Sequence, residues 1–328
     1  MASDEVWLAA AIRLSYRSYG RTCPSPNVGC IIVDDQGRVI GRGVTAPGGR
    51  PHAEARALAQ AGDAARGATA YVSLEPCAHV SPHGPCCTDL LIDAGIARVV
   101  IALQDPDPRT NGAGIARLRA AGIIVQSGLM KREAEKAMAG FLARQRRGRP
   151  FVTLKLATSL DGCIALADGT SRWITGPAAR AHAHVERARH ELILVGRGTL
   201  KADAPRLDVR LPGLEPYSPT PVLLSSDSRD LPEGWLRIAA PGDILTDPLP
   251  GDHLLVEGGA QTAAAFLAAD LVDRLLLYRA PILIGAGKPG LGDIRLTGLS
   301  DAHGRWRLDD SRMIGPDRLE VYERLRAA

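Results

Sequence analysis

The sequence predicts an α/β protein made of two domains in tandem. Short apolar strand segments alternate with Ala-rich helical segments in the first half, which is typical of a layered α/β sheet. A basic, Pro-containing stretch then interrupts the pattern, and a second series of the same kind begins at Phe151. A length of 328 residues suits two domains. We expect the domains to span residues 1–146 and 147–328.

The first half predicts a helix at 6–18 and then a hairpin. Its strands are 29–33 and 38–44, and Asp-Asp-Gln-Gly forms the turn. Glycines at 62 and 95 end two of the later helices. The remaining expected elements are helices at 52–61, 86–94 and 113–121 and strands at 69–74, 98–103 and 123–126.

Residues 144–150, Arg-Gln-Arg-Arg-Gly-Arg-Pro, are interpreted as the linker between the domains. A solvated helix end is the alternative, and both descriptions can hold. The second half predicts strands at 151–157, 192–195, 222–224, 253–257 and 274–284, helices at 177–190 and 261–269, and two antiparallel strands around Trp306 and Leu319.

Composition excludes several functional classes. The formal net charge of +4 is too small to require nucleic acid as a partner. No apolar run reaches the length that spans a membrane, so we expect a cytoplasmic protein. The six cysteines of such a chain indicate metal binding or catalysis where they cluster, at 77, 86 and 87. Cys23, Cys30 and Cys163 are interpreted as structural.

The chemistry is carried by His52-Ala53-Glu54, followed by Pro76-Cys77 and then Cys86. One imidazole and two thiolates form the protein ligands of a catalytic zinc with one position open for water. This pattern is the signature of zinc-dependent nucleobase deaminases, in which the glutamate moves protons and is not a ligand. His52 and Glu54 can face one site only if His52 lies at or before the first helical position, and Pro51 is consistent with that.

The third ligand has two candidates. Eight residues separate Cys77 from Cys86, whereas the generic signature has two, which argues against plain cytidine and transfer-RNA deaminases. We prefer Cys86, with Cys87 as a buried neighbour and rival ligand.

The second half contains two glycine-rich turns between strand and helix, Gly196-Arg197-Gly198-Thr199 and Gly258–Thr262. Such turns can bind a dinucleotide phosphate, although glycine often serves only the turn. No G-x-G-x-x-G motif lies between a predicted strand and a predicted helix, so the dinucleotide-binding fingerprint is not met. Arg187 and Arg210 suit a substrate phosphate because the guanidinium fork matches its oxygens.

At these residues the chain resembles the bifunctional deaminase–reductase family of riboflavin biosynthesis. The matching segments cover almost the whole chain in order. They are Pro26–Cys30, Pro51–Glu54, Leu74–His79, Pro85–Asp89, Gln104–Pro106, Lys155–Gly162, Ser171–Thr175, Val195–Thr199 and Val256–Gly259. The loop at 80–85 departs from the usual Gly and Thr-Pro-Pro pattern, and 234–251 is shorter than is typical.

The resemblance implies a cytidine-deaminase-like α/β/α domain followed by a dihydrofolate-reductase-like α/β domain. It implies zinc-dependent deamination of 2,5-diamino-6-ribosylamino-4(3H)-pyrimidinone 5′-phosphate and NADPH-dependent reduction of the ribosyl group of the product to ribityl. By position, the residues that would contact NADPH are Ala157, Trp173, Thr199, Asp203, Ser226, Gly259, Ala260, Gln261 and Thr262. Those that would contact substrate are Asn27, His79, Ser171, Arg187, Leu207, Arg210 and Glu257.

Two other functions remain as alternatives. One is a nucleoside or transfer-RNA deaminase with an appended binding domain, against which the full pattern of the second half argues. The other is a non-catalytic nucleic-acid binder that uses the arginines at 144–149, against which the intact Glu54 argues. We expect a small phosphorylated pyrimidine as the substrate, no nucleic-acid or membrane partner, and a homo-oligomer whose subunit number the sequence does not give.

Overall fold

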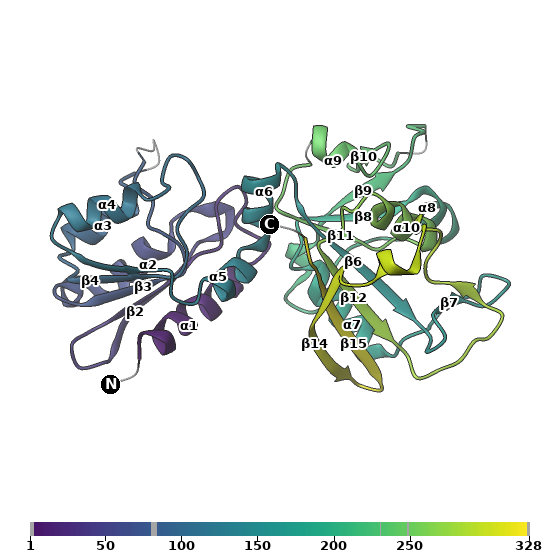
Figure 1. Cartoon of the computed structure of the whole chain (residues 1–328), viewed down its shortest axis with the longest axis horizontal. Coiled ribbons are helices and arrows are strands. Elements are labelled where there is room, and N and C mark those ends of the chain that lie inside the picture. The colour runs from purple at the N-terminus through teal and green to yellow at the C-terminus, as the bar shows by residue number, and fades with distance from the viewer. Residues whose placement is uncertain (1–2, 80–83, 230, 248, 327–328) are drawn as a thin grey trace. The chain divides into compact units, whose positions relative to one another are not determined.

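The structure is a computed structural model (Figure 1) that describes residues 3–79, 84–229, 231–247 and 249–326. The chain divides into two compact units, Met1–Gly148 and Arg149–Ala328, two residues after the expected boundary.

The first unit is built on a five-stranded sheet of order β2-β1-β3-β4-β5. Strands β1 and β2 form the expected antiparallel hairpin, β1 pairs antiparallel with β3, and β3, β4 and β5 run parallel. The elements are α1 (Asp4–Ser15), β1 (Gly29–Val33), β2 (Val39–Val44), α2 (Ala53–Ala61), β3 (Thr69–Val72), α3 (Cys87–Asp93), β4 (Arg98–Ile101), α4 (Ala113–Ala120), β5 (Ile124–Ser127), α5 (Lys131–Ala137) and α6 (Ala139–Arg147).

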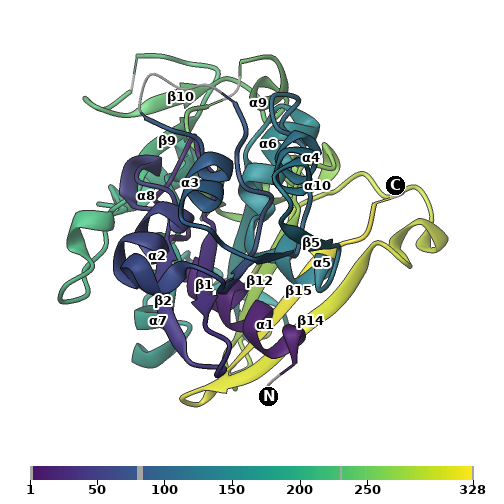
Figure 2. The same cartoon turned by 90° about the vertical axis from the view of Figure 1, so that its left-hand side faces the viewer.

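Glycines in the hairpin let helices approach both faces of this sheet. A Cβ at Gly29 would lie 2.0 Å from the carbonyl oxygen of Ala11 in α1. One at Gly43 would lie 1.9 Å from the carbonyl oxygen of Ala53 in α2. Gly43 pairs with Cys30, the neighbour of Gly29, and neighbouring residues of a strand face opposite sides of the sheet. Helices α1 and α2 therefore cover opposite faces, as Figure 2 shows around β1. The sheet is therefore the middle layer of an α/β/α sandwich.

Residues 144–150 contain the boundary between the two units, but they do not form an extended linker. Helix α6 continues to Arg147, and Gly148 ends it in the left-handed region at φ 66°. Arg149 is buried, and its guanidinium donates two hydrogen bonds to Asp273, at 2.6 and 2.9 Å. Both descriptions of the stretch therefore apply, since it is an exposed helix end and also the place where the units join.

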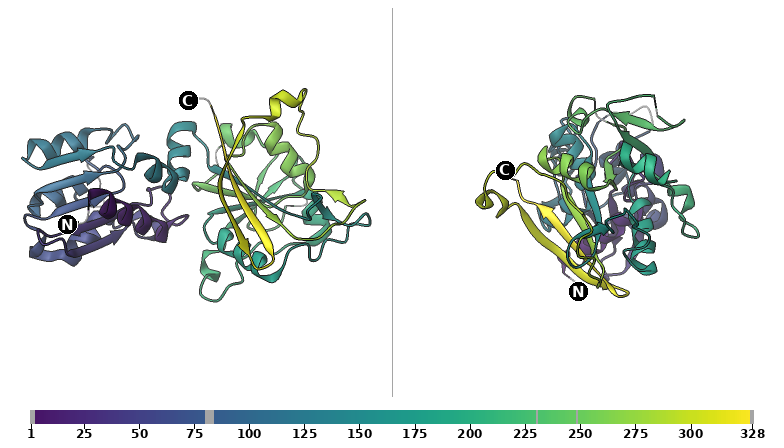
Figure 3. Two further views of the ribbon diagram at one scale, coloured as in Figure 1. Left: turned by 60° about the horizontal axis from the view of Figure 1, so that its bottom comes forward. Right: turned by 90° about the vertical axis from the view of Figure 1, so that its right-hand side faces the viewer.

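The second unit contains an eight-stranded sheet of order β10-β9-β8-β11-β6-β12-β15-β14. The first six strands are parallel, and the last two form the expected antiparallel hairpin, yellow in Figure 3. A second small sheet pairs β13 with β7. The elements are β6 (Phe151–Thr158), β7 (Cys163–Ala165), α7 (Pro177–Arg187), β8 (Leu192–Gly196), α8 (Arg197–Asp203), β9 (Thr220–Leu224), β10 (Leu236–Ile238), α9 (Asp243–Thr246), β11 (His253–Val256), α10 (Ala260–Ala268), β12 (Arg274–Arg279), β13 (Lys288–Pro289), β14 (Trp306–Ile314) and β15 (Asp317–Arg324).

Helices cover both faces of this sheet as well. Phe266 of α10 packs with Leu194 in one apolar cluster, whereas Ala179 of α7 packs with Leu276 in another. The strand expected at 274–284 ends at Arg279, because Pro281 cannot donate to a ladder and restricts the residue before it.

Candidate active sites

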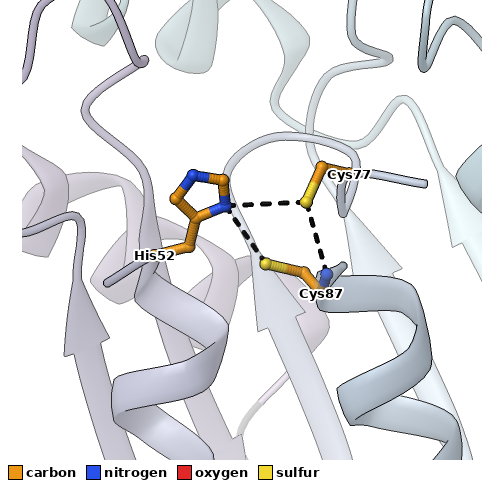
Figure 4. Close-up of side chains that lie close together, drawn as sticks. All are labelled: His52, Cys77 and Cys87. Carbon is orange, nitrogen blue, oxygen red and sulfur yellow. Dashed lines mark hydrogen bonds between the residues drawn. The ribbon is translucent and has the colours of Figure 1, made fainter. Parts of the chain in front are cut away.

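Three side chains that can ligate a metal lie together in the first unit, drawn in Figure 4. His52 is the N-cap of α2 with extended backbone, as the sequence requires for it to share a site with Glu54. Cys77 follows β3, and Cys87 begins α3. The Nδ1 atom of His52 lies 3.6 Å from Cys77 Sγ and 3.3 Å from Cys87 Sγ. All three ligand atoms lie within 4.8 Å of one another.

The structure places Cys87, and not the expected Cys86, beside His52 and Cys77. Cys86 is the N-cap of α3, and its thiol donates to Asp89 Oδ2 at 3.1 Å. Arg117 Nη1 lies 3.7 Å from the same sulfur. Cys86 has an extended backbone and Cys87 is the first helical residue, so the two adjacent side chains leave the chain in different directions.

The electrostatics of the cluster favour a thiolate. The thiol of Cys87 and then His52 hydrogen-bond to Cys77, and these contacts outweigh burial and lower the pKa of Cys77 to about 4. The backbone N–H of Cys87 also donates to Cys77 Sγ at 3.3 Å. A buried set of one imidazole and two sulfurs, one of them readily ionised, fits zinc and leaves one tetrahedral position open.

Glu54 is buried beside this cluster, with 3% of its surface exposed. Burial raises its pKa to about 6, against the opposing effect of His52. A carboxyl group with a pKa near the working pH can both accept and return a proton, which suits a general acid–base role.

The cluster opens into a cavity of about 630 Å³. Glu54 and His79 line it as expected, and His79 Nδ1 lies 3.3 Å from Thr110 Oγ1. Sequence reasoning missed several polar lining residues, among them Arg50, Asp105 and Arg109. Burial raises the pKa of Asp105 to about 6. The segment Gln104–Pro106, which carries the family resemblance, was the available signal for Asp105.

Asn27 was expected to contact substrate but is not among the lining residues of this cavity. It is buried, and its side-chain nitrogen donates to the carbonyl oxygens of Ala137 at 3.0 Å and Ser15 at 3.4 Å. These bonds tie the loop before β1 to α5 and to the end of α1. Residues 80–83 of the loop at 80–85, which departs from the family pattern, lie outside the described residues.

The second unit has a cavity of about 740 Å³ where the two glycine-rich turns meet. A Cβ on Gly196 or on Gly258 would lie 2.3 Å from the side chain of Thr262, so these glycines allow the turns to pack together. A Cβ on Gly198, in contrast, would meet nothing within 4 Å. Six of the residues expected to contact the cofactor line this cavity: Thr199, Asp203, Gly259, Ala260, Gln261 and Thr262.

The other three residues expected to contact the cofactor do not line the cavity. Ala157 is half-buried in β6, Ser226 is exposed after β9, and Trp173 is 65% exposed in the loop before α7. Arg172 ion-pairs with Asp203 at 3.6 Å, which brings the Trp173 loop to the cavity wall.

Most of the residues expected to contact the reductase substrate form one cluster. Arg187 Nε and Nη2 donate to the two carboxylate oxygens of Glu257 at 2.8 and 2.9 Å. Arg187 Nη1 donates to the carbonyl oxygen of Asp208 at 3.0 Å, next to buried Leu207. Arg210 is exposed, 3.4 Å from the Asp208 carboxylate. Ser171 is half-buried in the loop before α7.

The guanidinium fork of Arg187, expected to meet a phosphate, is therefore occupied by Glu257. Burial raises the pKa of Glu257, but the hydrogen bond from Arg187 and the positive charge of Lys155 outweigh it and lower the pKa to about 2. Glu257 is thus held as a carboxylate, and Arg187 positions it.

Known proteins match this arrangement in both units. Residues 1–103 match the cytidine and deoxycytidylate deaminase zinc-binding region, and residues 150–248 and 242–319 match the RibD C-terminal domain. The riboflavin biosynthesis protein RibD of Escherichia coli K12 is 39% identical, covering 96% of this chain and 97% of its own. The chain belongs to the RibD family. RibD of Mycobacterium tuberculosis H37Rv is 40% identical over 95% of both chains.

Solved RibD structures share the whole architecture. Acinetobacter baumannii RibD superposes with a TM-score of 0.85 at 34% identity, covering 98% of this chain and 99% of that one. The deaminase/reductase of Thermotoga maritima gives a TM-score of 0.87 at 30% identity over the same shares. The expected α/β class of both halves is confirmed, as is a riboflavin-biosynthesis enzyme with a zinc-binding deaminase domain and an NADPH-dependent reductase domain. An appended binding domain without reductase character is excluded.

Proposed function

We propose that this chain deaminates 2,5-diamino-6-ribosylamino-4(3H)-pyrimidinone 5′-phosphate and then reduces the ribosyl group of the product to ribityl with NADPH. The observation that carries the first step is the His52–Cys77–Cys87 cluster beside buried Glu54 at the wall of a cavity. The T. maritima relative is described as a diaminohydroxyphosphoribosylaminopyrimidine deaminase and 5-amino-6-(5-phosphoribosylamino)uracil reductase, which supports the same substrates here.

In the deaminase site, this chain would hold zinc through His52, Cys77 and one thiol of the Cys86–Cys87 pair. When bound there, zinc supplies Lewis acidity that lowers the pKa of a water molecule. Glu54 would accept one proton as the water oxygen adds to the ring carbon that bears the exocyclic amine, and would pass it to the ring nitrogen. It would then move the remaining hydroxyl proton to the amine. The bond from carbon to the amine breaks as the carbonyl forms, so one water is consumed for each ammonia that leaves. His79 lines the wall where the pyrimidine would lie.

In the reductase site, the cavity between the glycine-rich turns would hold the dinucleotide, with α10 beginning at Ala260 and presenting its free N–H groups. Hydride transfer depends mainly on the orientation of donor and acceptor. Glu257, fixed by Arg187, and Lys155, 4.0 Å from Glu257, would orient the sugar. Arg210, exposed nearby, would meet the substrate phosphate.

The two adjacent cysteines are distinguished by zinc content. From the geometry, Cys87→Ser should lower zinc to well under one ion per chain, whereas Cys86→Ser, which removes only the contacts to Asp89 and Arg117, should keep it. Zinc retained in the Cys87 variant and lost from the Cys86 variant would restore the assignment made from the sequence.

The complete activity is tested by incubating the protein with NADPH and the phosphorylated diaminopyrimidinone. Ammonia release followed by NADPH oxidation is the expected result. Deamination of RNA with neither product would overturn the proposal.

Among the described residues, no helix has the length and apolar character needed to cross a bilayer. A cytoplasmic location and a homo-oligomer stay predictions. Light scattering at several protein concentrations tests the second.

A further inference from the structure

An exposed aromatic ring in the second unit, that of Trp173, is in contact with the cationic side chain of Arg180. Trp173 is 65% exposed, and the guanidinium of Arg180 lies 4.6 Å from the centre of its ring. This distance is within the range of a cation–π contact. Arg172 is farther away, 5.9 Å from the same centre.

Arg180 also holds the backbone that carries the ring. It belongs to α7, and its Nη1 atom donates to the carbonyl oxygen of Thr175 at 2.6 Å. Thr175 is buried, and the next residue, Gly176, donates its N–H to the buried carboxylate of Asp317 at 2.7 Å. One guanidinium therefore fixes both the Trp173 ring and the turn after it to a rigid helix.

The loop that carries the ring is linked to the second cavity by an ion pair. Arg172 pairs with Asp203, which lines that cavity. An indole with most of its surface in water stabilises the fold little, because apolar surface contributes when it is removed from water. A fixed and exposed indole is instead suited to stacking on a planar ligand.

We infer that Arg180 is a positioning residue for cofactor binding, which presents the open surface of Trp173 to the NADPH that the proposed function requires. Arg180 itself does not contact the dinucleotide. Arg180 covers one face of the indole and fixes the orientation of the loop. NADPH therefore stacks on a preformed surface, and its binding does not include the entropy cost of ordering the loop.

Arg180→Met keeps the length of the side chain but removes its charge and hydrogen bond. It should raise the Kd for NADPH about 5- to 20-fold, because the loop loses both the cation–π contact and the hydrogen bond to Thr175 that order it before the ligand binds. The kcat at saturating NADPH and the KM for the pyrimidine should stay within about twofold. Arg180→Lys should recover most of the loss, because the ammonium keeps the cation over the ring.

A double-mutant cycle tests whether Arg180 affects NADPH binding through Trp173. In a Trp173→Ala background, Arg180→Met should weaken NADPH binding no more than about twofold further, since the ring it positions is absent. Arg189→Met is the matched control, because Arg189 follows the same helix and pairs with Glu186 at 3.0 Å. It should leave Kd unchanged.

Binding of reduced nicotinamide mononucleotide and of adenosine 2′,5′-bisphosphate shows which half of the dinucleotide stacks. Weaker binding of either fragment in Arg180→Met supports the inference. An unchanged Kd for NADPH in Arg180→Met, or the same loss with and without Trp173, would overturn it. If the unaltered protein does not bind NADPH, the proposed function fails instead.

Discussion

Replacing Gly43 by alanine tests whether packing of the hairpin sets the geometry of the metal cluster. The new Cβ would lie 1.9 Å from the carbonyl oxygen of Ala53 and 2.7 Å from the nitrogen of Ala57. Both atoms are backbone of α2, so the helix start must move. An ordinary carbon–oxygen contact needs about 3.2 Å or more, so the displacement is on the order of 1 Å.

This displacement falls on the residues that do the chemistry. Ala53 lies between His52 and Glu54, so both side chains move with it. Overpacking of this kind destabilises a domain by about 1–3 kcal/mol, and a misplacement of about 1 Å can lower a catalytic rate about 100-fold. We expect Gly43→Ala to lose zinc and about two orders of magnitude of deaminase kcat/KM.

The assay has two internal controls. The reductase activity of the same chain, measured on the deaminated intermediate, should be unchanged. Gly41→Ala places a Cβ 2.3 Å from the carbonyl oxygen of Ala57, one turn farther along α2, and should destabilise the domain similarly with a smaller loss of deamination. Full zinc content and more than half of the deaminase activity in Gly43→Ala would refute the reasoning.

Three further predictions concern single carboxylates and their partners. Glu54→Gln should keep zinc and lower deamination by about 10²–10⁴-fold while the reductase step stays measurable; loss of both activities would contradict separate sites. Arg187→Ala should raise the reductase KM for substrate, because it releases Glu257 from its fixed position, and an unchanged KM would remove it from the site. The low pKa of Glu257, about 2 in the folded chain against an ordinary 4.5, gives stability that is present above pH 4.5 and lost as pH falls toward 2. Acid titration of unfolding should show about 3 kcal/mol of this dependence in the reductase unit, and Glu257→Gln should remove it.

The sequence by itself determined the chemistry and most of the secondary structure. Pro51 before His52 indicated a helix start, and the structure has His52 at the N-cap with Glu54 buried two residues later. These features follow from the backbone preferences of residues at a helix start, which depend only on the few residues of that segment. Helices α5 and α6, which Met138 separates at φ −112°, were not expected from the sequence.

Only the tertiary structure decided which partner each functional side chain meets. Cys86 and Cys87 are the same residue type at adjacent positions, and the direction of α3 brings the second toward His52. The side-chain nitrogen of Asn27 donates to the backbone carbonyls of Ala137 and Ser15, which are 110 and 12 residues away in the sequence. Arg187, the last residue of α7, meets Glu257, which follows β11, across 70 residues of the sequence. Such pairings depend on how distant elements pack, and the spacing of residues along the chain does not contain that information.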